Sequence, residues 1–172
     1  GTYTIGSSTS ADYVDFNAAL TDLNAFGVCG PVVFNVEDGT YAGGLTVGNV
    51  LGVNSTNTIT FQSLSGDSSA VIVSSASGTV LTFAGAEYVT FKGMSLVNSG
   101  GGHGVDLSSG ASNNTVTNCI IQVPASTSSA NVPVYNFSGS LEEFNTFNNN
   151  IISGGYYAIY NYGSSTTSME DG

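Results

Sequence analysis

A short phrase of sequence occurs twice in the second half of the chain, and it restricts the fold more than any other feature. Residues 114–121 are NTVTNCII, and residues 145–152 are NTFNNNII. Related segments begin at Thr90 (TFKGMSL) and, in part, at Thr60 (TFQ), so that successive copies are 30, 25 and 31 residues apart. A second phrase, VYNFSG from residue 134, returns as IYNYGS 25 residues later. Strand-like repeats of this period are typical of solenoids and propellers.

A parallel β-helix explains why polar residues recur together with the apolar ones. A propeller blade needs four strands and about 40 residues, and an antiparallel sandwich does not return equivalent residues in one phase. In a parallel β-helix each coil lies on the previous one at about 4.8 Å, so that equivalent side chains form columns. Alternation within the copies predicts an inward column of Phe61, Phe91, Val116 and Phe147 beside an outward column of Thr60, Thr90, Thr115 and Thr146.

One position within the repeat is predicted to form a turn. Three residues after the last three inward residues, the chain has Met94, Cys119 and Asn150. A buried amide at such a position can hydrogen-bond to the coils above and below it. We interpret Cys119 as a small buried residue and not as a reactive thiol. Because Cys29 belongs to the first coil and Cys119 to a much later one, we expect no disulfide between them.

The beginning of the chain has a different pattern, with Phe16, Leu20, Leu23 and Phe26 spaced three or four residues apart. This spacing predicts an amphipathic helix over residues 12–26, with Asp12 or Asp15 as the N-cap and Gly27 directly after the end. The first coil of a solenoid exposes an apolar cross-section, so we assign residues 1–30 as an N-terminal cap. The following run GPVVFNV, residues 30–36, predicts a strand that is buried on both faces.

The predicted fold class is therefore all-β: a right-handed, single-stranded parallel β-helix with an N-terminal capping α-helix. Residues 31–172 are assigned to the coils. Residues 156–172 begin another coil without a cap signal. We expect the chain to be truncated at its C-terminal end and the native protein to continue beyond Gly172, with further domains of the same polypeptide as partners.

The charge of the chain excludes several partners. Twelve acidic residues and one Lys or Arg give a formal net charge of −11. Nucleic acid and anionic lipid are excluded because phosphate binding depends on Lys and Arg. Acidic polysaccharides would be repelled unless a cation intervened, whereas neutral sugars would not. No apolar run approaches the roughly 20 residues that span a bilayer, so we expect no membrane insertion.

The segments DFNAAL, GPVVFNVEDGTYAGGLTVGN and NTITFQS, between Asp15 and Ser63, together with the later repeats, resemble a known family. They are similar to the right-handed parallel β-helix of the pectate-lyase-like superfamily. The closest likeness is to β-helical domains in large secreted and cell-surface proteins of Bacteroidetes-type bacteria, which share the opening GTYTIG. The resemblance covers nearly the whole chain and implies an extracellular or cell-surface location, but a fold does not define a function.

The segment GVDLSSGASNNTVTNC, residues 104–119, is similar to the pectin methylesterase segment that contains the nucleophilic Asp, which would correspond to Asp106. In that family an Arg contacts the site, whereas this chain has no Arg, and the second carboxylate and the glutamine motifs are not matched. The Arg and calcium of pectate lyases, and the Asp, His, Arg and Lys of polygalacturonases, are not matched as complete sets either. We therefore assign no catalytic residue.

The remaining polar residues have simpler interpretations. Glu142 and Glu143 are adjacent and are predicted to lie on a solvated loop instead of facing each other across a groove. His103, in GGGHG, is interpreted as an exposed loop histidine. No cofactor or metal site is expected: calcium is not indicated because no Asp-x-Asp spacing occurs, although backbone carbonyls could contribute ligands.

The second repeated phrase places Tyr135 on Tyr160 and Phe137 on Tyr162. In one register these rings are core, and in the other they form an outward aromatic strip suited to sugar rings. In the outward register Asp106 lies in the same column and can accept sugar hydroxyls. The predicted carbohydrate-binding residues are Tyr135, Tyr160, Tyr162 and Asp106.

These observations predict an extracellular structural or adhesive segment of a larger surface protein that binds neutral glycans. One alternative is a polysaccharide-active enzyme (a lyase, hydrolase or esterase) whose site is incomplete in this chain. Another is an ice-binding surface, for which a regular Thr-x-Thr ladder is the expected sign. The repeat pairs are Thr60/Gln62, Thr90/Lys92, Thr115/Thr117 and Thr146/Asn148, so only one coil conforms.

Overall fold

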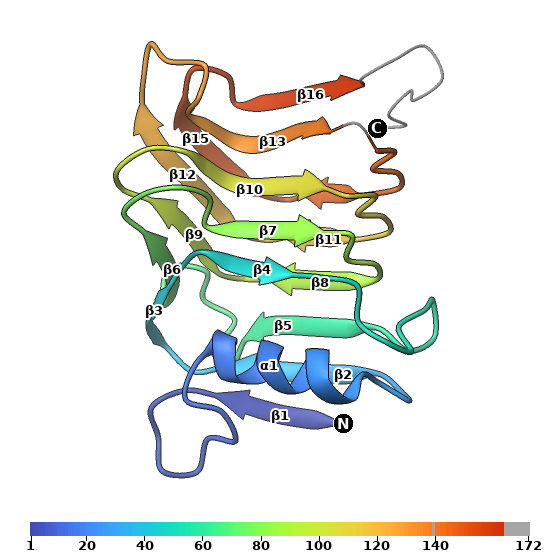
Figure 1. Cartoon of the computed structure of the whole chain (residues 1–172). Helices are drawn as coiled ribbons and strands as arrows, with labels where there is room; N and C mark the ends of the chain where they lie inside the picture. The colour runs from blue at the N-terminus through green and yellow to red at the C-terminus, as the bar shows by residue number, and fades with distance from the viewer. Residues whose placement is uncertain (139, 164–172) are drawn as a thin grey trace.

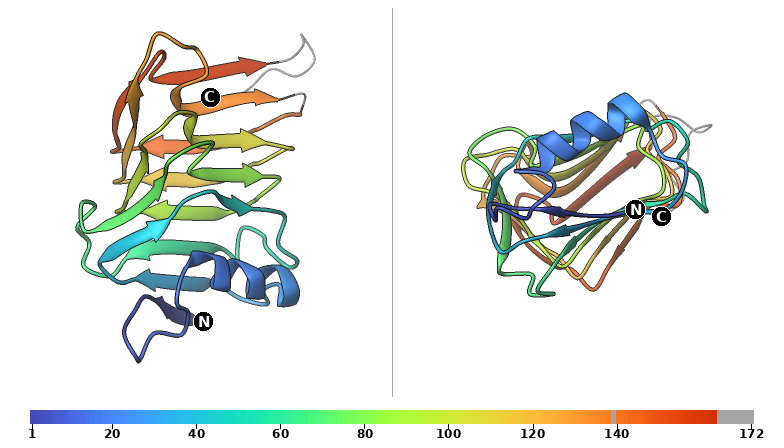
Figure 2. Two further views of the ribbon diagram at one scale, coloured as in Figure 1. Left: turned by 60° about the vertical axis from the view of Figure 1, so that its left-hand side comes forward. Right: turned by 90° about the horizontal axis from the view of Figure 1, so that it is seen from below.

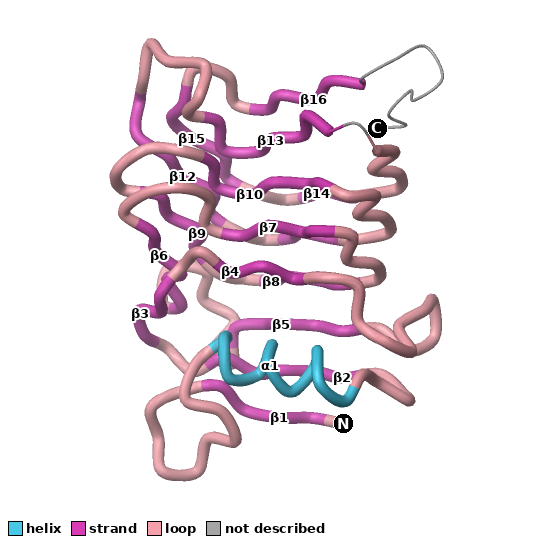
Figure 3. The backbone as a smooth tube through the Cα atoms, in the orientation of Figure 1, coloured by secondary structure: helices cyan, strands magenta, loops and turns pink. Residues whose placement is uncertain are grey.

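The computed structural model describes residues 1–138 and 140–163, and these form a right-handed parallel β-helix of about five turns (Figure 1). All strand pairs are parallel, and the strands form three sheets whose order follows the coils. Figure 3 shows strands along the sides of each coil and loops at its corners. The predicted fold class is therefore confirmed. Parallel strands need crossover connections, and in this fold each connection passes through the other two sheets.

The three sheets are named A, B and C here. Sheet A consists of β1 (Thr2–Ile5), β2 (Val32–Val36), β5 (Ile59–Ser63), β8 (Val89–Lys92), β11 (Thr115–Thr117) and β14 (Thr146–Asn148). Sheet B consists of β3 (Gly39–Ala42), β6 (Val71–Ser75), β9 (Ser95–Asn98), β12 (Ile120–Ala125) and β15 (Ile151–Gly155). Sheet C consists of β4 (Leu45–Val47), β7 (Leu81–Ala84), β10 (His103–Ser108), β13 (Val132–Ser138) and β16 (Ile159–Gly163).

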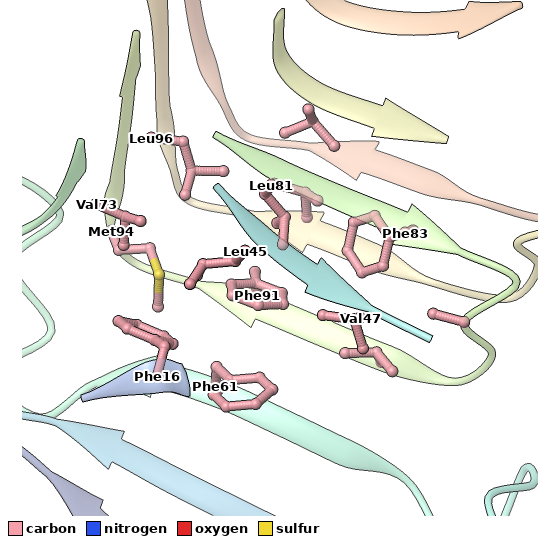
Figure 4. Packing of buried hydrophobic residues seen from close by; sticks show 14 of the residues in the cluster. Phe16, Leu45, Val47, Phe61, Val73, Leu81, Phe83, Phe91, Met94 and Leu96 are labelled. Atoms are coloured by element: carbon pink, nitrogen blue, oxygen red, sulfur yellow. The ribbon is translucent and has the colours of Figure 1, made fainter. Parts of the chain in front are cut away.

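The repeated phrase is stacked on its own copies in sheet A, as predicted. Phe61 pairs with Phe91, Phe91 with Val116, and Val116 with Phe147. The first three are buried and Phe147 is partly buried. The rings of Phe61 and Phe91 are stacked with centroids 4.8 Å apart, and further core side chains surround them (Figure 4). The matching threonines, Thr60, Thr90, Thr115 and Thr146, are paired on the outer face.

The turn between sheets A and B explains why Asn recurs in the phrase. Gly93, Asn118 and Asn149 occupy this corner in successive coils, with φ values of 67°, 53° and 53°. This left-handed conformation favours Gly and Asn over other residues. At the next position Asn150 bonds to the coil below: its Oδ1 accepts from the Cys119 N–H at 2.8 Å, and its Nδ2 donates to the Val116 carbonyl at 2.8 Å. The expected amide contact between coils is confirmed here.

The predicted helix is present as α1 (Phe16–Phe26), with Gly27 after its end. The Asp15 carboxylate accepts from the Ala18 N–H at 2.9 Å, so Asp15 is the N-cap. The helix buries Phe16, Ala19, Leu20 and Leu23, contacts β4, and lies in the position that a strand of sheet C would take in the first coil (Figures 1 and 2). This arrangement is compatible with a cap, because the helix covers the apolar cross-section below β4.

Three expectations for the N-terminal region are wrong. Phe26 is 80% exposed, because it ends the helix on the side away from the core. The helix begins at Phe16 and not at residue 12, and the Asp12 carboxylate instead accepts from the Thr4 N–H at 2.8 Å. The strand β2 is not buried on both faces, because Val33 and Asn35 are only partly buried while the alternate residues Phe34 and Val36 are in the core. Its outer face is simply the outer face of sheet A.

The strand β1 was not predicted, and it extends sheet A by one rung below β2. Its pairing places Thr2 opposite Val33 and Thr4 opposite Asn35. On the other edge of β1, the Thr4 carbonyl accepts from the Tyr13 N–H at 3.0 Å, beside the bond from the Thr4 N–H to Asp12. These two bonds block an edge that would otherwise be open to pairing with another strand.

Both cysteines are free thiols. Cys29 is exposed, whereas Cys119 is buried in the corner column between Met94 and Asn150. Burial raises the pKa of the Cys119 thiol, which agrees with its interpretation as a small core residue.

Candidate binding surface on sheet C

The tyrosines of the second repeated phrase face outward. In β13, Val134 and Asn136 are buried and Tyr135 between them is only partly buried. The register with β10 places Val134 on Val105, which is fully buried. Because alternate residues of a strand point to opposite faces, an inward Val134 forces Tyr135 outward. The interpretation of the rings as core is therefore wrong, and the outward register is the one adopted.

The predicted site residues are aligned by the strand pairing of sheet C. Asp106 pairs with Tyr135, and Tyr135 pairs with Tyr160, so the three lie in one outward column. Thr82 precedes them in the same column, on β7. Tyr162 lies two residues beyond Tyr160 and is 50% exposed. It pairs with Phe137, as expected, although the side chain of Phe137 lies outside the described part of the chain.

His103 belongs to this surface, which the sequence interpretation missed. It begins β10 instead of lying in a loop, it is half-buried, and its ring stacks on that of Tyr135 with centroids 4.0 Å apart and planes 5° from parallel. Burial lowers the pKa of His103, so the imidazole is neutral near pH 7. The glycines before His103 complete the turn, so the chain enters sheet C at His103 itself. The run of residues 103–108 is the sequence feature that could have placed His103 in a strand.

The aromatic tract consists of His103, Tyr135, Tyr157, Tyr160 and Tyr162. The rings of Tyr135 and Tyr160 are 5.6 Å apart and 15° from parallel, whereas those of Tyr157 and Tyr160 are 5.3 Å apart but tilted by 44°. Near-parallel rings at such separations turn their faces largely toward each other along the column. Tyr135, which lies between His103 and Tyr160, therefore presents mainly its ring edge to solvent. The outer ring of Tyr162 has a more accessible face.

Asp106 is the acidic residue of the surface and is half-buried. Burial, with a smaller contribution from the negative charge of Glu142, raises its pKa to about 6. The negative charge of Asp106 contributes in turn to raising the pKa of Tyr135, after the larger effect of burial. Asp106 can therefore exchange a proton close to neutral pH and can either accept or donate a hydrogen bond there.

Glu142 is buried instead of lying on a solvated loop, and that expectation is wrong. Only 3% of the residue is exposed, and its Oε1 accepts from the Gly110 N–H at 2.9 Å. The loop before β14 folds back over the preceding coil, since the Glu143 carbonyl also accepts from the Asn113 N–H at 3.0 Å. Asp106 and Glu142, two carboxylates with different surroundings, lie near each other at this corner of sheet C.

A pocket of about 230 Å³ lies on the inner side of sheet C, within the last described coils, and its lining includes the apolar side chains Leu107, Val134, Phe147 and Ile159. Tyr160 and Glu142 line it together with the amides Asn136, Asn145 and Asn161. The Asn136 Nδ2 donates to the Asn161 Oδ1 at 2.9 Å, so these two inward amides of adjacent coils satisfy each other. The pocket therefore lies behind the tract, on the core side of sheet C, and Tyr160 is the one residue that belongs to both.

The chain has no match among the protein-family models, curated proteins or solved structures with which it was compared. In the described part of the chain, no cluster of three or more His, Cys, Asp or Glu side chains could hold a metal ion. Within residues 1–138 and 140–163, no helix has the length and apolarity needed to cross a membrane. The arrangement of the site is thus the basis for any assignment of function.

Proposed function

We propose that this chain is a rigid structural segment of an extracellular or cell-surface protein and that it adheres to neutral glycans through the outer face of sheet C. The observation that carries the proposal is the outward column in which Asp106, Tyr135 and Tyr160 are stacked. Large aromatic residues usually contribute to a β core. Their concentration on one outer face is typical of a surface that binds a ligand.

The chemistry of this face suits an uncharged polyhydroxylated ligand. A net charge of −11 opposes polyanions, including nucleic acids and uncomplexed polyuronates. Sugar rings combine apolar C–H faces with hydroxyls, and the tract offers aromatic edges and outer faces beside the Asp106 carboxyl. Because the stack covers the faces of its middle rings, the outer ring of Tyr162 is the strongest candidate for contact with the face of a sugar.

The fold supports a structural role in addition to adhesion. Stacked coils hold the outer columns in fixed register over the length of the β-helix, without a flexible linker between them. One Lys or Arg in 172 residues leaves almost no sites for trypsin-like proteases, as suits an exposed segment. The similarity to β-helical domains of the pectate-lyase-like superfamily in bacterial surface proteins supports the same location, with further domains of the polypeptide as partners. The proposal requires no cofactor.

The test is binding to an array of neutral oligosaccharides, followed by titration of the strongest ligand. We expect Tyr162→Ala and Tyr160→Ala to weaken binding at least about tenfold, equivalent to about 1.4 kcal/mol. Thr90→Ala, on the outer face of sheet A, is the matched control and is expected to leave affinity unchanged. Absence of any glycan signal above background, or an equal loss in Thr90→Ala, would contradict the proposal.

A second candidate is a polysaccharide-active enzyme, and the pair Asp106 and Glu142 favours it. Glycosidases use two carboxyl groups, one of them a general acid with a raised pKa. Asp106, with its pKa of about 6, would be that acid. Release of reducing ends from a neutral polysaccharide, lost in Asp106→Asn, would select the enzyme. Binding without turnover would select the adhesive segment.

A further inference from the structure

A separate pocket lies at the other end of the molecule, where α1, β1 and β2 meet. Its volume is about 240 Å³, and its walls include four aromatic rings, one leucine and one carboxylate: Tyr3, Tyr13, Phe26, Phe34, Leu23 and Asp22. None of these residues belongs to the aromatic tract of sheet C.

Three of the rings form a packed wall. The centroids of Tyr3, Tyr13 and Phe34 are 5.7 to 5.9 Å apart, and Tyr13 meets the other two edge to face. Phe34 is buried in the core, while Tyr3 remains 38% exposed. The wall is therefore anchored by β2 and held rigidly at the edge of the pocket. A bound group would meet preformed ring surfaces, which reduces the entropy lost on binding.

Phe26 forms the outer rim of the pocket. It is the last residue of α1 and is 80% exposed, although its spacing in the sequence matches the buried face of the helix. The chain turns at Gly27, where φ is 66°, and leaves the ring of Phe26 beside the pocket instead of in the core. Such an exposed phenyl group contributes little to folding but is available to a ligand.

The pocket is lined by one charged side chain, the carboxylate of Asp22, while the α-ammonium of Gly1 lies near Tyr3 and donates to the Pro31 carbonyl. Asp22 is exposed, and its carboxylate accepts from the Tyr13 hydroxyl at 3.2 Å. Burial raises the pKa of Tyr13, and the hydrogen bond and charge of Asp22 raise it further, with smaller contributions from Tyr3 and Asp12. The one basic side chain of the protein, Lys92, lies on β8 on the outer face of sheet A. A cation entering the pocket would therefore meet a carboxylate and the negative faces of aromatic rings together.

We propose that this pocket binds an organic cation of the quaternary ammonium class, with the methyl groups against Phe26 and Tyr13 and the positive charge near Asp22. Aromatic faces attract such ions within about 6 Å of the ring centroid, most strongly where water is partly excluded. A quaternary ammonium group is bulky and weakly hydrated, so its methyl groups can contact the exposed rings of this open pocket while the carboxylate attracts its charge. This inference does not rest on glycan binding by sheet C.

The test compares choline with its uncharged isostere 3,3-dimethylbutan-1-ol, by NMR titration of the full chain at low ionic strength. We expect choline to shift the resonances of Tyr13 and Phe26 and to bind at least about fivefold more tightly than the isostere, as an ionic contribution of roughly 1 kcal/mol implies. Phe26→Ala and Asp22→Asn should each weaken binding by a similar factor. Both residues are exposed, so both variants are expected to fold; thermal unfolding checks this.

Leu64→Ala is the matched control, because Leu64 is exposed and lies outside the pocket. It should leave choline affinity unchanged. Equal affinity for choline and the isostere, or no effect of Phe26→Ala and Asp22→Asn in folded protein, would overturn the proposal. The absence of any choline-induced shift at Tyr13 and Phe26 would also overturn it. Co-sedimentation with phosphatidylcholine vesicles, with phosphatidylglycerol vesicles as the control, would identify a lipid headgroup as the source of the cation. Binding of free choline without co-sedimentation would identify a soluble amine.

Discussion

The outer faces of sheets A and C are built by the same parallel pairing but display different chemistry. On sheet A one outward column is almost entirely threonine: Thr2, Val33, Thr60, Thr90, Thr115 and Thr146. On sheet C the corresponding column changes along the coils, from Thr82 through Asp106 to Tyr135 and Tyr160. The small polar side chains of one face and the large rings of the other are carried by equally regular strands.

This difference distinguishes the inward columns, which maintain the fold, from the outward columns, whose residues are free to vary. Inward columns must be apolar or internally hydrogen-bonded, as Asn136 and Asn161 are, because each inward residue packs on its own copies and an unpaired polar residue there would lose hydration. Outward columns have no such requirement, so their composition can follow a ligand. We infer that function in this molecule lies in the columns that depart from small polar residues, and the following predictions test that separation.

The largest expected effect distinguishes the two faces of a single strand. Phe91 is fully buried in β8, with Phe61 stacked on one side at 4.8 Å, and its neighbour Thr90 faces outward. Phe91→Ala should lower the free energy of unfolding by about 3–5 kcal/mol, because it removes a ring from a packed column and leaves a cavity. Thr90→Ala should change it by no more than about 0.5 kcal/mol. Urea unfolding followed by circular dichroism measures both, and equal losses would contradict the assigned register.

The next effect concerns the acidic residue of sheet C. The raised pKa of Asp106 means that folding favours its protonated form, so its contribution to stability is fully present below pH 4 and is lost as the pH rises through about 6. A shift of this size corresponds to roughly 3 kcal/mol for a buried group, and screening of the half-exposed carboxyl reduces this to about 1 kcal/mol. Asp106→Asn should therefore stabilise the protein by about 1 kcal/mol at pH 8 and by much less at pH 4.

Stability measured by thermal unfolding at several pH values between 4 and 8 tests this prediction. Thr90→Ala is again the control, since it should keep the pH dependence of the native chain. An Asp106→Asn variant whose stability follows the native curve at every pH would show that the carboxyl is not the group responsible.

The fold was predictable because repeated residues specify the register between successive coils. The copies around Phe91, Val116 and Phe147 specify both the stacking and the inward face, and local periodicity specifies α1 through Phe16, Leu20 and Leu23. The strand β1 was not predicted because its residues have no copy in the later coils. Its place depends on pairing with β2 and on the bonds that Asp12 and Tyr13 make to Thr4.

The site was only partly predictable for a related reason. Alignment of Asp106, Tyr135 and Tyr160 follows from the repeat, but the face on which they lie depends on which alternate residues fill the core. Val134 and Asn136 fill it, and a sequence that places Val, Tyr, Asn and Phe in succession allows either choice. The roles of His103 and Glu142 depend on the paths of two irregular loops, which periodicity does not describe.

A smaller effect is expected at the corner between sheets A and B. Asn118 has a φ of 53°, and its N–H donates to the Asn148 carbonyl at 3.3 Å. Asn118→Ala should lower the free energy of unfolding by roughly 1 kcal/mol, because the left-handed conformation is less favourable for alanine than for asparagine. Asn118→Gly should be close to neutral, as the Gly93 corner of the preceding coil suggests. If both variants lost equal stability in urea unfolding, the side chain and not the backbone conformation would be the cause.

The smallest effect on stability, and the sharpest test of the two faces, comes from making the sheet A face more regular. The second outward column contains Gln62 and Lys92 beside Thr117, so that of the rungs β5, β8 and β11 only β11 has the Thr-x-Thr pair; the pair recurs on β1 as Thr2 and Thr4. Replacing Gln62→Thr and Lys92→Thr together would create three consecutive Thr-x-Thr rungs while changing stability by only about 0.5 kcal/mol, because both side chains face outward. A regular hydroxyl array of this kind is what an ice-binding surface requires. We therefore expect no thermal hysteresis from the native chain and a measurable gain in the double variant. Hysteresis in the native chain would instead assign a function to sheet A, and the separation drawn here between a structural outer face and a binding outer face would have to be abandoned.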